Sequence, residues 1–463
     1  MRTIMRYLLL CLLLSCYGIG KGQIWQEVDG GVNRFINQLY CDSATNTLFA
    51  AGQFNNAGSN YVGCIAKFDG ERWHALDSGL GHLPFSYNTS NSVIVYHSQI
   101  FAGGQFAKLD GVGLNATSYM ATWDGIHWQA CGNPTGPCYL SIANDNLFAT
   151  GTYDSISGQA IDHIAKWNGS TWESFGSPLP WQAGDREVVK SVVYFQGAYY
   201  FAGNFEDENG GNEILKYDNA GWHSLANGIR GSNSYINDMV VYHNLLFVAG
   251  KFLSINGNAK DYVMAWDGEK WIDPFPDIQF WFEAYDLEVI GGKLYIVAPV
   301  TSDQIRRMHT LAHFDGTYFC IFGSGEESLL NVAGMDDRLF VSGAPNPVPP
   351  RFDIHYIAEW IGGNTTDSCI YQPVSVSSDT ISSTFDILVF PNPAYQSFKI
   401  ETNPAFSSFT LRIHDITGRE VAASRTYRAG DPPVDVTHLS AGLYFVEVRV
   451  KDRVEVVKLV KEN

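Results

Sequence analysis

The 463-residue chain lacks the long apolar runs, the basic surface and the helical periodicity that would suit a membrane span, a nucleic-acid partner or a helical fold. Its 30 basic side chains are outnumbered by 48 acidic ones, which argues against binding to nucleic acid or anionic lipid. After the first residues no apolar run is long enough to cross a bilayer, so no membrane span is expected. With 45 glycines, 14% aromatic residues and few helix-like stretches, the chain is predicted to be all-β.

Motifs for catalysis and for metal or cofactor binding are also absent. The histidines are scattered, and no Gly-x-Ser-x-Gly elbow, phosphate-binding loop, CxxC pair or metal-ligand histidine pair occurs. No catalytic residue, metal or cofactor is therefore assigned. Two carboxylates that cleave a glycoside need to meet only in space, so the sequence leaves glycoside cleavage open.

Residues 1–22 have the features of a secretory signal peptide. Two arginines precede an apolar run that ends at Tyr17, and small residues follow it. That run is too short to span a membrane, and we expect cleavage before Gln23. Cys16 lies in a loose match to a lipoprotein cleavage site, which is a second interpretation of this segment.

Six cysteines remain after removal of the signal peptide. Cys131 and Cys138 flank a loop rich in glycine and proline that can bring them together, and in an exported protein this predicts a local disulfide. A zinc site is the alternative, although no further ligand pattern accompanies the pair. The sequence does not pair the other four, which are Cys41, Cys64, Cys320 and Cys369.

One phrase recurs along residues 23–363. Its copy at Cys64–Leu76 reads CIAKFDGERWHAL, an apolar alternation that enters an Asp-Gly turn and leaves it at a tryptophan, as in a β-hairpin. A second phrase, first seen as LFAAGQF at Leu48–Phe54, precedes each copy, and a further apolar run precedes that. Seven units of four strands predict a seven-bladed β-propeller over residues 23–363. Further copies of the first phrase begin at Met120, Ile164, Ile214, Val263, Leu311 and, incompletely, Ile357.

The repeats start and end out of phase. The strand at Trp25 has the character of a fourth strand with no third strand before it, whereas the third strand that ends at Trp360 has no fourth strand after it. We therefore expect the N-terminal strand to complete the last blade, which leaves no unfinished blade at the junction.

This pattern of strand, Asp-Gly turn and tryptophan resembles kelch-type propellers. IAKWNGSTW at Ile164–Trp172 is also similar to the repeats of the fungal cortical cell-polarity marker family. The resemblance covers residues 23–363 and implies a scaffold. Because such propellers host enzymes, lectins and structural proteins alike, it implies no particular activity.

The loops between blades, and those between second and third strands, are long and varied, and we expect them on one face of the ring. They carry aromatic side chains beside carboxylates. This combination suits a neutral sugar, whose C–H faces stack on rings and whose hydroxyl groups donate to acids. The alternative is that these aromatic side chains pack between blades. The predicted ligand-binding residues are Phe85, Tyr87, Trp181, Asp185, Phe280, Trp281 and Glu283.

The sequence thus favours a monomeric protein that binds an extracellular ligand, a glycan or a protein, through its long-loop face. Two alternatives stay open. One is a polysaccharide hydrolase or lyase that uses carboxylates of the same loops, and the other is a structural, adhesin-like module.

The composition changes after residue 363. Residues 364–384 are rich in serine and threonine and are predicted to form a flexible linker. Residues 385–463 contain short alternating apolar runs, which predict a small immunoglobulin-like β-sandwich.

Four motifs follow one another in this last segment. The residues that carry them are Pro391, Asn392, Pro393, Asp415, Gly418, Arg419, Gly442, Tyr444 and Lys458. In this order they closely resemble the type A C-terminal sorting domain of cargo for the type IX secretion system of Bacteroidetes. The resemblance implies that the secretion machinery is a partner and that the product is secreted or displayed on the outer-membrane cell surface.

Overall fold

The computed structural model of the protein describes residues 25–77, 79–80, 88–106, 118–161, 163–176, 188–204, 214–225, 229–230, 234–252, 254–255, 262–302, 309–322, 328–344, 356–361, 368–371, 386–390, 394–403, 408–415, 420–428, 431–450 and 453–461. Every named element in these residues is a β-strand, which confirms the all-β prediction. Within them, no helix is long and apolar enough to cross a membrane. The chain divides into two compact units, Met1–Ser375 and Val376–Asn463. The signal peptide predicted for residues 1–22 lies outside the described residues.

The described part of the first unit is built from six antiparallel sheets of four strands and one larger sheet, here numbered in chain order. Sheet 1 comprises β2 (Ile36–Asp42), β3 (Thr47–Gly52), β6 (Ile65–Phe68) and β7 (Trp73–Ala75). Sheet 2 comprises β8 (Thr89–Tyr96), β9 (Gln99–Phe106), β10 (Ser118–Trp123) and β11 (Trp128–Ala130). Sheet 3 comprises β12 (Cys138–Ala143), β13 (Asn146–Gly151), β16 (Ile164–Trp167) and β17 (Trp172–Ser174). Sheet 4 comprises β18 (Val188–Phe195), β19 (Ala198–Asn204), β20 (Ile214–Asp218) and β21 (Gly221–Ser224).

The remaining sheets of this unit follow the same order of strands. Sheet 5 comprises β23 (Tyr235–Tyr242), β24 (Leu245–Lys251), β26 (Val263–Trp266) and β27 (Trp271–Ile272). Sheet 6, the larger one, comprises β28 (Ile278–Phe280), β29 (Asp286–Ile290), β30 (Lys293–Ser302), β31 (His309–Phe314), β32 (Tyr318–Phe322) and β36 (Ser368–Tyr371). Sheet 7 comprises β33 (Ser328–Met335), β34 (Arg338–Ala344), β35 (Ile357–Trp360) and β1 (Trp25–Glu27). Short two-stranded pairs are β4 (Asn56–Ala57) with β5 (Asn60–Tyr61), β14 (Ser155–Ile156) with β15 (Gln159–Ala160), and β22 (Ile229–Arg230) with β25 (Ser254–Ile255).

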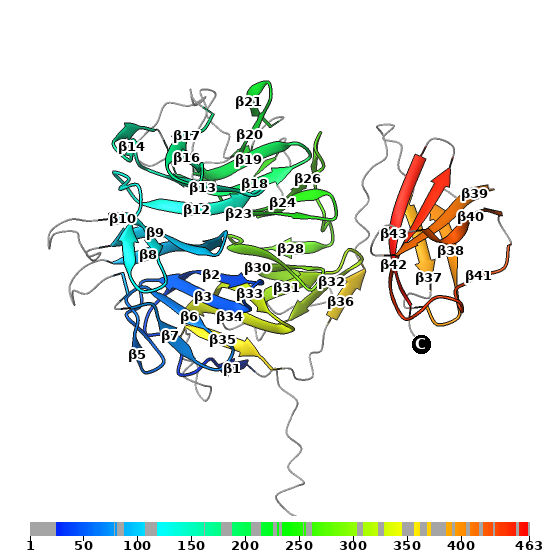
Figure 1. The fold of residues 1–463 in the computed structure, drawn as a ribbon, viewed down its shortest axis with the longest axis horizontal. Helices are drawn as coiled ribbons and strands as arrows, with labels where there is room; N and C mark the ends of the chain where they lie inside the picture. The colour runs from blue at the N-terminus through cyan, green and yellow to red at the C-terminus, as the bar shows by residue number, and fades with distance from the viewer. Residues whose placement is uncertain are drawn as a thin grey trace, which may run out of the picture. The chain divides into compact units, whose positions relative to one another are not determined.

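The seven sheets follow one another around a closed ring. The first strand of each sheet contacts the first strand of the next, from β2 through β8, β12, β18, β23 and β29 to β33. Strand β33 in turn contacts β2, so sheet 7 lies beside sheet 1. Figure 1 shows this return, with the yellow β33 and β34 next to the blue β2 and β3. The arrangement is consistent with the blades of a β-propeller.

A phenylalanine at one position of the second strand fills the space between neighbouring sheets. Phe49 of sheet 1 packs in one cluster with Val93 and Ala102 of sheet 2, and the same relation recurs around the ring. Burial of each such side chain contributes about 1.5–3 kcal/mol, so the repeated phrase is the source of the core. The equivalent buried residues are Phe101, Phe148 and Phe247, and in sheet 4 Tyr200 takes this place.

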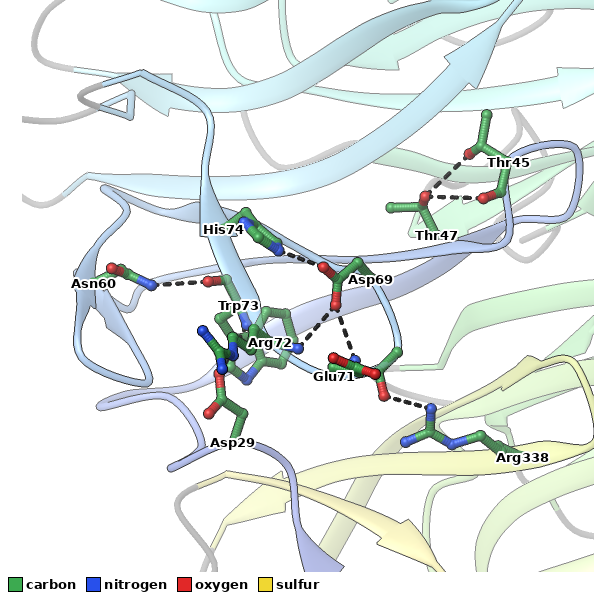
Figure 2. A network of polar contacts seen from close by, with 11 residues as sticks. Asp29, Thr45, Thr47, Asn60, Asp69, Glu71, Arg72, Trp73, His74 and Arg338 are labelled. Carbon is green, nitrogen blue, oxygen red and sulfur yellow. Dashed lines mark hydrogen bonds and ion pairs between the residues drawn. The ribbon is translucent and has the colours of Figure 1, made fainter.

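The recurring Asp-Gly turns are stabilised by the side chain that opens them. Asp69 Oδ1 accepts hydrogen bonds of 2.9 Å from the main-chain N–H groups of Glu71 and Arg72, and His74 contacts the other carboxylate oxygen (Figure 2). These bonds hold the pKa of Asp69 far below its usual range. Gly70 follows with φ of 101°, a conformation that favours glycine. The same pair of main-chain bonds recurs at Asp124, Asn168, Asp267 and Asp315.

In sheets 1, 2 and 4 the tryptophan that follows the turn joins its sheet to the segment leaving the preceding fourth strand. The indole N–H of Trp73 donates to the carbonyl oxygen of Val28 at 2.8 Å, and that of Trp128 donates to Leu76 at 3.1 Å. Trp222 makes the equivalent bond to Gly176. A buried indole N–H is stabilised by a partner, and these three bonds link successive sheets. Among the described residues, the equivalent indole N–H of Trp271 in sheet 5 is buried without one.

The N-terminal strand completes sheet 7, as predicted. Trp25 lies directly opposite Trp360 in the β1–β35 pairing, and their rings meet edge to face with centroids 5.0 Å apart. The chain then continues to sheet 1, where Asp29 Oδ2 accepts a hydrogen bond of 2.9 Å from the main-chain N–H of Trp73 (Figure 2). The first residues described therefore connect the last sheet of the ring to the first.

The predicted disulfide between Cys131 and Cys138 is not formed, and this prediction is corrected. Both thiols are buried and free. The Cys138 Sγ–H donates to the carbonyl oxygen of Tyr119 at 3.1 Å, whereas Cys131 Sγ accepts from the Trp172 indole N–H at 3.4 Å. Each sulfur thus already has a partner within the packing between sheets 2 and 3.

Cys320 and Cys369 form the disulfide in the structure, with sulfurs 2.06 Å apart. They lie directly opposite each other because β36 pairs with β32 at the outer edge of sheet 6. Strand β36 falls within residues 364–384, which were predicted to be a flexible linker. The part Ser368–Tyr371 is instead an additional strand of the first unit.

The second unit contains two sheets around one core. One sheet comprises β37 (Asp386–Phe390), β38 (Ser397–Asn403) and β41 (Val434–Asp435). The other comprises β39 (Ser408–Asp415), β40 (Glu420–Arg428), β42 (Gly442–Val450) and β43 (Arg453–Lys461), drawn in orange and red in Figure 1. Both sheets bury apolar side chains in the same cluster, including Phe398, Ile413 and Val446.

Some of the predicted sorting residues can be placed in this unit. Asp415 ends β39 directly opposite Tyr444 of β42, whose hydroxyl group donates to the carbonyl oxygen of Ser440 at 2.9 Å. Gly442 begins β42, and Lys458 lies in β43. Pro391, Asn392, Pro393, Gly418 and Arg419 lie outside the described residues.

Candidate functional site

Three of the seven predicted ligand-binding residues lie in the described part of the chain, and they follow one another just before β29. Phe280 is only 5% exposed and packs against Phe275 and Phe319, so it belongs to the core. Trp281 is 46% exposed and the neighbouring Phe282 is 58% exposed. The other four, Phe85, Tyr87, Trp181 and Asp185, lie outside the described residues.

The backbone beneath the exposed aromatic pair is held in place. Phe280 lies opposite Val300 in the β28–β30 pairing, and the main-chain N–H of Trp281 donates to the carbonyl oxygen of Pro299 at 3.0 Å. Trp281 is thus presented from a strand end that is fixed to sheet 6. A rigid support of this kind lowers the entropy cost of binding.

Glu283, the third of these residues, accepts two short hydrogen bonds from sheet 5. The Tyr235 hydroxyl group donates to Oε2 and the Asn237 amide donates to Oε1, both at 2.7 Å. The Asn237 amide also donates to the carbonyl oxygen of Ala284 at 3.0 Å. Burial, together with the hydrogen bond and charge of Glu283, raises the pKa of Tyr235, so the hydroxyl group remains protonated.

Lys190 extends this network to sheet 4. Its Nζ donates to Asn237 Oδ1 at 2.9 Å and lies 5.2 Å from the centre of the Tyr235 ring, in a cation–π arrangement. Burial lowers the pKa of Lys190, and the charge of Glu283 opposes that shift. The polar cluster comprises Lys190, Tyr235, Asn237 and Glu283. It joins three successive sheets at the end of the ring where the first strands begin.

Two β-bulges aim Lys190 and Asn237 into the polar cluster. The register of β18 with β19 shifts between Val189 and Ser191, and that of β23 with β24 shifts between Ile236 and Asp238. A bulged residue is left unpaired, and its side chain is redirected. Lys190, Tyr235 and Asn237 are not among the predicted site residues. The polar pair that interrupts the apolar alternation, Lys190-Ser191 or Asn237-Asp238, is the sequence signal that marks each bulge.

Similar register shifts precede Gln38 in sheet 1 and Ser92 in sheet 2. The residue after each shift joins its first strand to the first strand of the next sheet, and these first strands are the inner strands of the ring. Gln38 accepts a hydrogen bond from the main-chain N–H of Val93 at 2.8 Å, and Ser92 accepts one from Leu140 at 2.9 Å. Asp238 accepts in the same way from Leu287 at 3.2 Å. The same arrangement recurs in sheet 6, where Asp286 accepts from Val332 at 2.7 Å.

The carboxylates along these inner strands have raised pKa values. Asp238 and Asp286 are half-buried and Glu288 has an exposed surface, yet all three lie on first strands that pack against one another around the inside of the ring. Burial therefore raises all three pKa values, that of Glu288 to about 8, and the charge of Asp286 adds to the shift of Asp238 and Glu288. Since Asp238 and Asp286 accept main-chain N–H groups of the next sheet, we assign them to the frame.

Metal ligation has no obvious place in this arrangement. Across the residues that the structure describes, no three His, Cys, Asp or Glu side chains come together in a group that could hold a metal ion. The chemistry available at the polar cluster is therefore hydrogen bonding by fixed amide, phenol, ammonium and carboxylate groups, next to two exposed aromatic side chains.

Comparison with known proteins identifies the end of the chain. Residues 388–462 match the family model described as a secretion system C-terminal sorting domain. The chain is therefore cargo of the type IX secretion system, whose machinery it engages through this domain, and it is secreted or displayed at the cell surface. No curated protein matches the chain.

Among solved structures, the chain is similar to the extracellular domain of the one-component system BT4673 from B. thetaiotaomicron. The two share 10% sequence identity at a TM-score of 0.42, and the match covers 96% of this chain. It covers 59% of that chain, so the present protein spans about three-fifths of its length.

Proposed function

We propose that this secretion cargo carries a seven-bladed β-propeller, which binds an extracellular glycan at the end of the ring where the first strands begin. The cyclic contacts of the seven first strands and the completion of sheet 7 by β1 support the propeller. The second unit would then be the immunoglobulin-like sorting sandwich of residues 385–463, joined to the propeller by the part of residues 364–384 that follows β36.

The polar cluster is the observation that carries the binding proposal. Four polar side chains from three sheets are held by bonds of 2.7–2.9 Å, and one of them, Glu283, directly follows the exposed Trp281 and Phe282 in the chain. Exposed aromatic faces stack on the C–H faces of a sugar, and fixed amide and carboxylate groups bind its hydroxyl groups. Phe280 is no longer part of this proposal because its ring is buried.

A polysaccharide hydrolase or lyase has less support. Two of the three carboxylates with raised pKa values, Asp238 and Asp286, would be candidates for a general acid, but they are engaged with main-chain N–H groups of neighbouring strands. A purely structural, adhesin-like module would not explain why the polar cluster adjoins the exposed pair Trp281 and Phe282 in the chain.

A glycan array probed with the full chain tests the proposal. We expect binding that falls at least tenfold in Trp281→Ala and in Glu283→Gln. Tyr318→Ala is the matched control, because Tyr318 is 47% exposed and lies on β32, away from the polar cluster. Wild-type binding in both site variants, or equal loss in all three variants, would contradict the assignment.

A further inference from the structure

A pocket of about 520 Å³ lies between sheets 2 and 3, at the end of the ring that carries the Asp-Gly turns. One wall is the hairpin turn of β8 and β9, with Tyr96, His97 and Gln99. The other wall is formed by Trp167, Glu173 and the turn between them. First strands begin at the polar cluster and end here, so the pocket is a separate place from the site proposed above.

At other junctions of the ring, a side chain from the equivalent hairpin occupies this space. Arg338 of sheet 7 donates from Nη1 to the carbonyl oxygen of Gly70 in sheet 1 at 2.8 Å, as Figure 2 shows. Gln196 of sheet 4 donates to Asp267 of sheet 5 at 3.0 Å. His243 of sheet 5 lies so close to Gly316 of sheet 6 that an added Cβ would come within 2.3 Å of its ring.

His97 has the same sequence context as His243 but a different position. Each histidine stacks on the tyrosine before it, with centroids 4.0 Å apart for Tyr96–His97 and 4.1 Å for Tyr242–His243. His97 then turns to Asp145, whose carboxylate is 3.1 Å from Nε2. As a result nothing lies within 4 Å of the Cβ position of Gly169, the glycine of the sheet 3 turn.

An uncovered glycine alone does not make a pocket. Gly125 and Gly221, the turn glycines of sheets 2 and 4, are also uncovered. Among the seven hairpins, however, a Tyr-His pair occurs only in sheets 2 and 5, and in sheet 5 the histidine closes the space. Sheets 2 and 3 therefore combine an aromatic wall with an open turn.

The lining combines aromatic rings with balanced polar groups. Trp167 is half-buried, and its ring is held by Phe101 and Trp172 with centroids 5.9 and 5.2 Å away. Beside it, Lys166 lies directly opposite Glu173 in the β16–β17 pairing, so the two charges cancel. The Glu173 carboxylate accepts a hydrogen bond from the Asn168 amide, which fixes its place on the rim.

We propose that this pocket binds a neutral saccharide of one or two sugar units. The volume lies in the range of small-ligand sites, and the half-buried ring of Trp167, across the pocket from the stacked Tyr96 and His97, offers a face for C–H stacking. The adjacent ammonium and carboxylate groups give a donor and an acceptor for sugar hydroxyl groups. Because their charges cancel, a charged ligand gains nothing there, and because the rim is polar, an apolar ligand would leave it unsolvated.

Isothermal titration of the full chain with cellobiose, maltose, lactose and diacetylchitobiose tests this site. Gln99→Arg places in sheet 2 the residue that Arg338 supplies at the equivalent hairpin position of sheet 7, and it should close the pocket. Glu173→Ala removes the acceptor. We expect at least one disaccharide to bind, and both variants to weaken it at least tenfold.

Gln129→Ala is the matched control. Gln129 holds the turn residue Asp124 in sheet 2, as Glu173 holds Asn168 in sheet 3, but it does not line the pocket. It should bind as the wild type does. The proposal is overturned if none of the four disaccharides binds, or if binding survives Gln99→Arg and Glu173→Ala. Binding lost only in Trp281→Ala would place the sugar at the polar cluster and would also overturn it.

Discussion

Arg338 and Gly70 are 268 positions apart in the chain, yet the guanidinium of one donates to the carbonyl oxygen of the other at 2.8 Å. The same guanidinium binds both carboxylate oxygens of Glu359 at 2.6 Å. It also lies 5.0 Å from the centre of the Phe340 ring. One side chain thus ties sheet 7 to sheet 1 at the junction that β1 completes.

Replacement of Arg338 by methionine should therefore loosen the ring junction. Hydrogen bonds that involve a charged group contribute about 1.5–3 kcal/mol, and Glu359 would lose its partner. We expect the free energy of unfolding, measured by urea denaturation, to fall by about 2–3 kcal/mol. Arg72→Met is the control, because the Arg72 backbone rather than its side chain bonds to Asp69. Equal losses in both variants would refute a special role for Arg338.

The disulfide Cys320–Cys369 should stabilise the first unit against unfolding. It closes a loop with a sequence separation of 49, for which chain entropy gives about 4 kcal/mol. Cys369→Ser should lower the melting temperature measured by calorimetry, and dithiothreitol should have the same effect on the wild type. A melting temperature that neither treatment changes would show that the disulfide adds no stability to the first unit.

The remaining cysteines should resist alkylation while the protein is folded. Burial raises the pKa of the Cys138 thiol and of the Cys64 thiol to about 12 each, and that of Cys41 to about 11. Since the thiolate is the reactive form, iodoacetamide at pH 8 should leave these residues unmodified in mass spectrometry until urea is added. Rapid labelling of native Cys138 would contradict the packing between sheets 2 and 3.

Glu288 should make the protein less stable as the pH rises. Enclosure raises its pKa from 4.5 to about 8, so between these values the folded state binds more protons than the unfolded state, and stability falls as pH increases through this window. Glu288→Gln should reduce the fall in melting temperature between pH 5 and pH 8.5. Asp69→Asn is the control, because a lowered pKa acts only on the acid side. An unchanged pH slope in Glu288→Gln would count against this account.

Removal of residues 385–463 should leave the protein in the periplasm. The deletion takes away the segment that matches the secretion system sorting domain, and the two units are separately compact. Immunoblots of periplasm, cell surface and medium give the distribution. As a gain-of-function control, a periplasmic reporter fused to residues 385–463 should reach the surface or the medium. Normal export of the truncated chain would show that the signal lies elsewhere.

Much of the scaffold could be predicted because it is local. The Asp-Gly turns, the tryptophan after each turn and the period-two strands are set by residues close together in sequence, and the incomplete last repeat identified Trp25 and Trp360 as partners. The tail motifs are likewise contiguous. Such features are set by short-range hydrogen bonds and by the alternation of apolar and polar residues, and they do not depend on contacts with distant sheets.

The site depended on the tertiary structure, because its residues come from sheets roughly a repeat apart. The bulges that direct Lys190 and Asn237 toward Glu283, the burial of Phe280 beside an exposed Trp281, and the pairing of Cys320 with Cys369 all depend on how neighbouring strands pack. His97 and His243 share one sequence pattern, yet the neighbouring sheet decides that one closes its junction and the other leaves a pocket. The sequence by itself determined the repeat and the destination of this protein, whereas only the contacts between sheets decided which side chains remain free to bind.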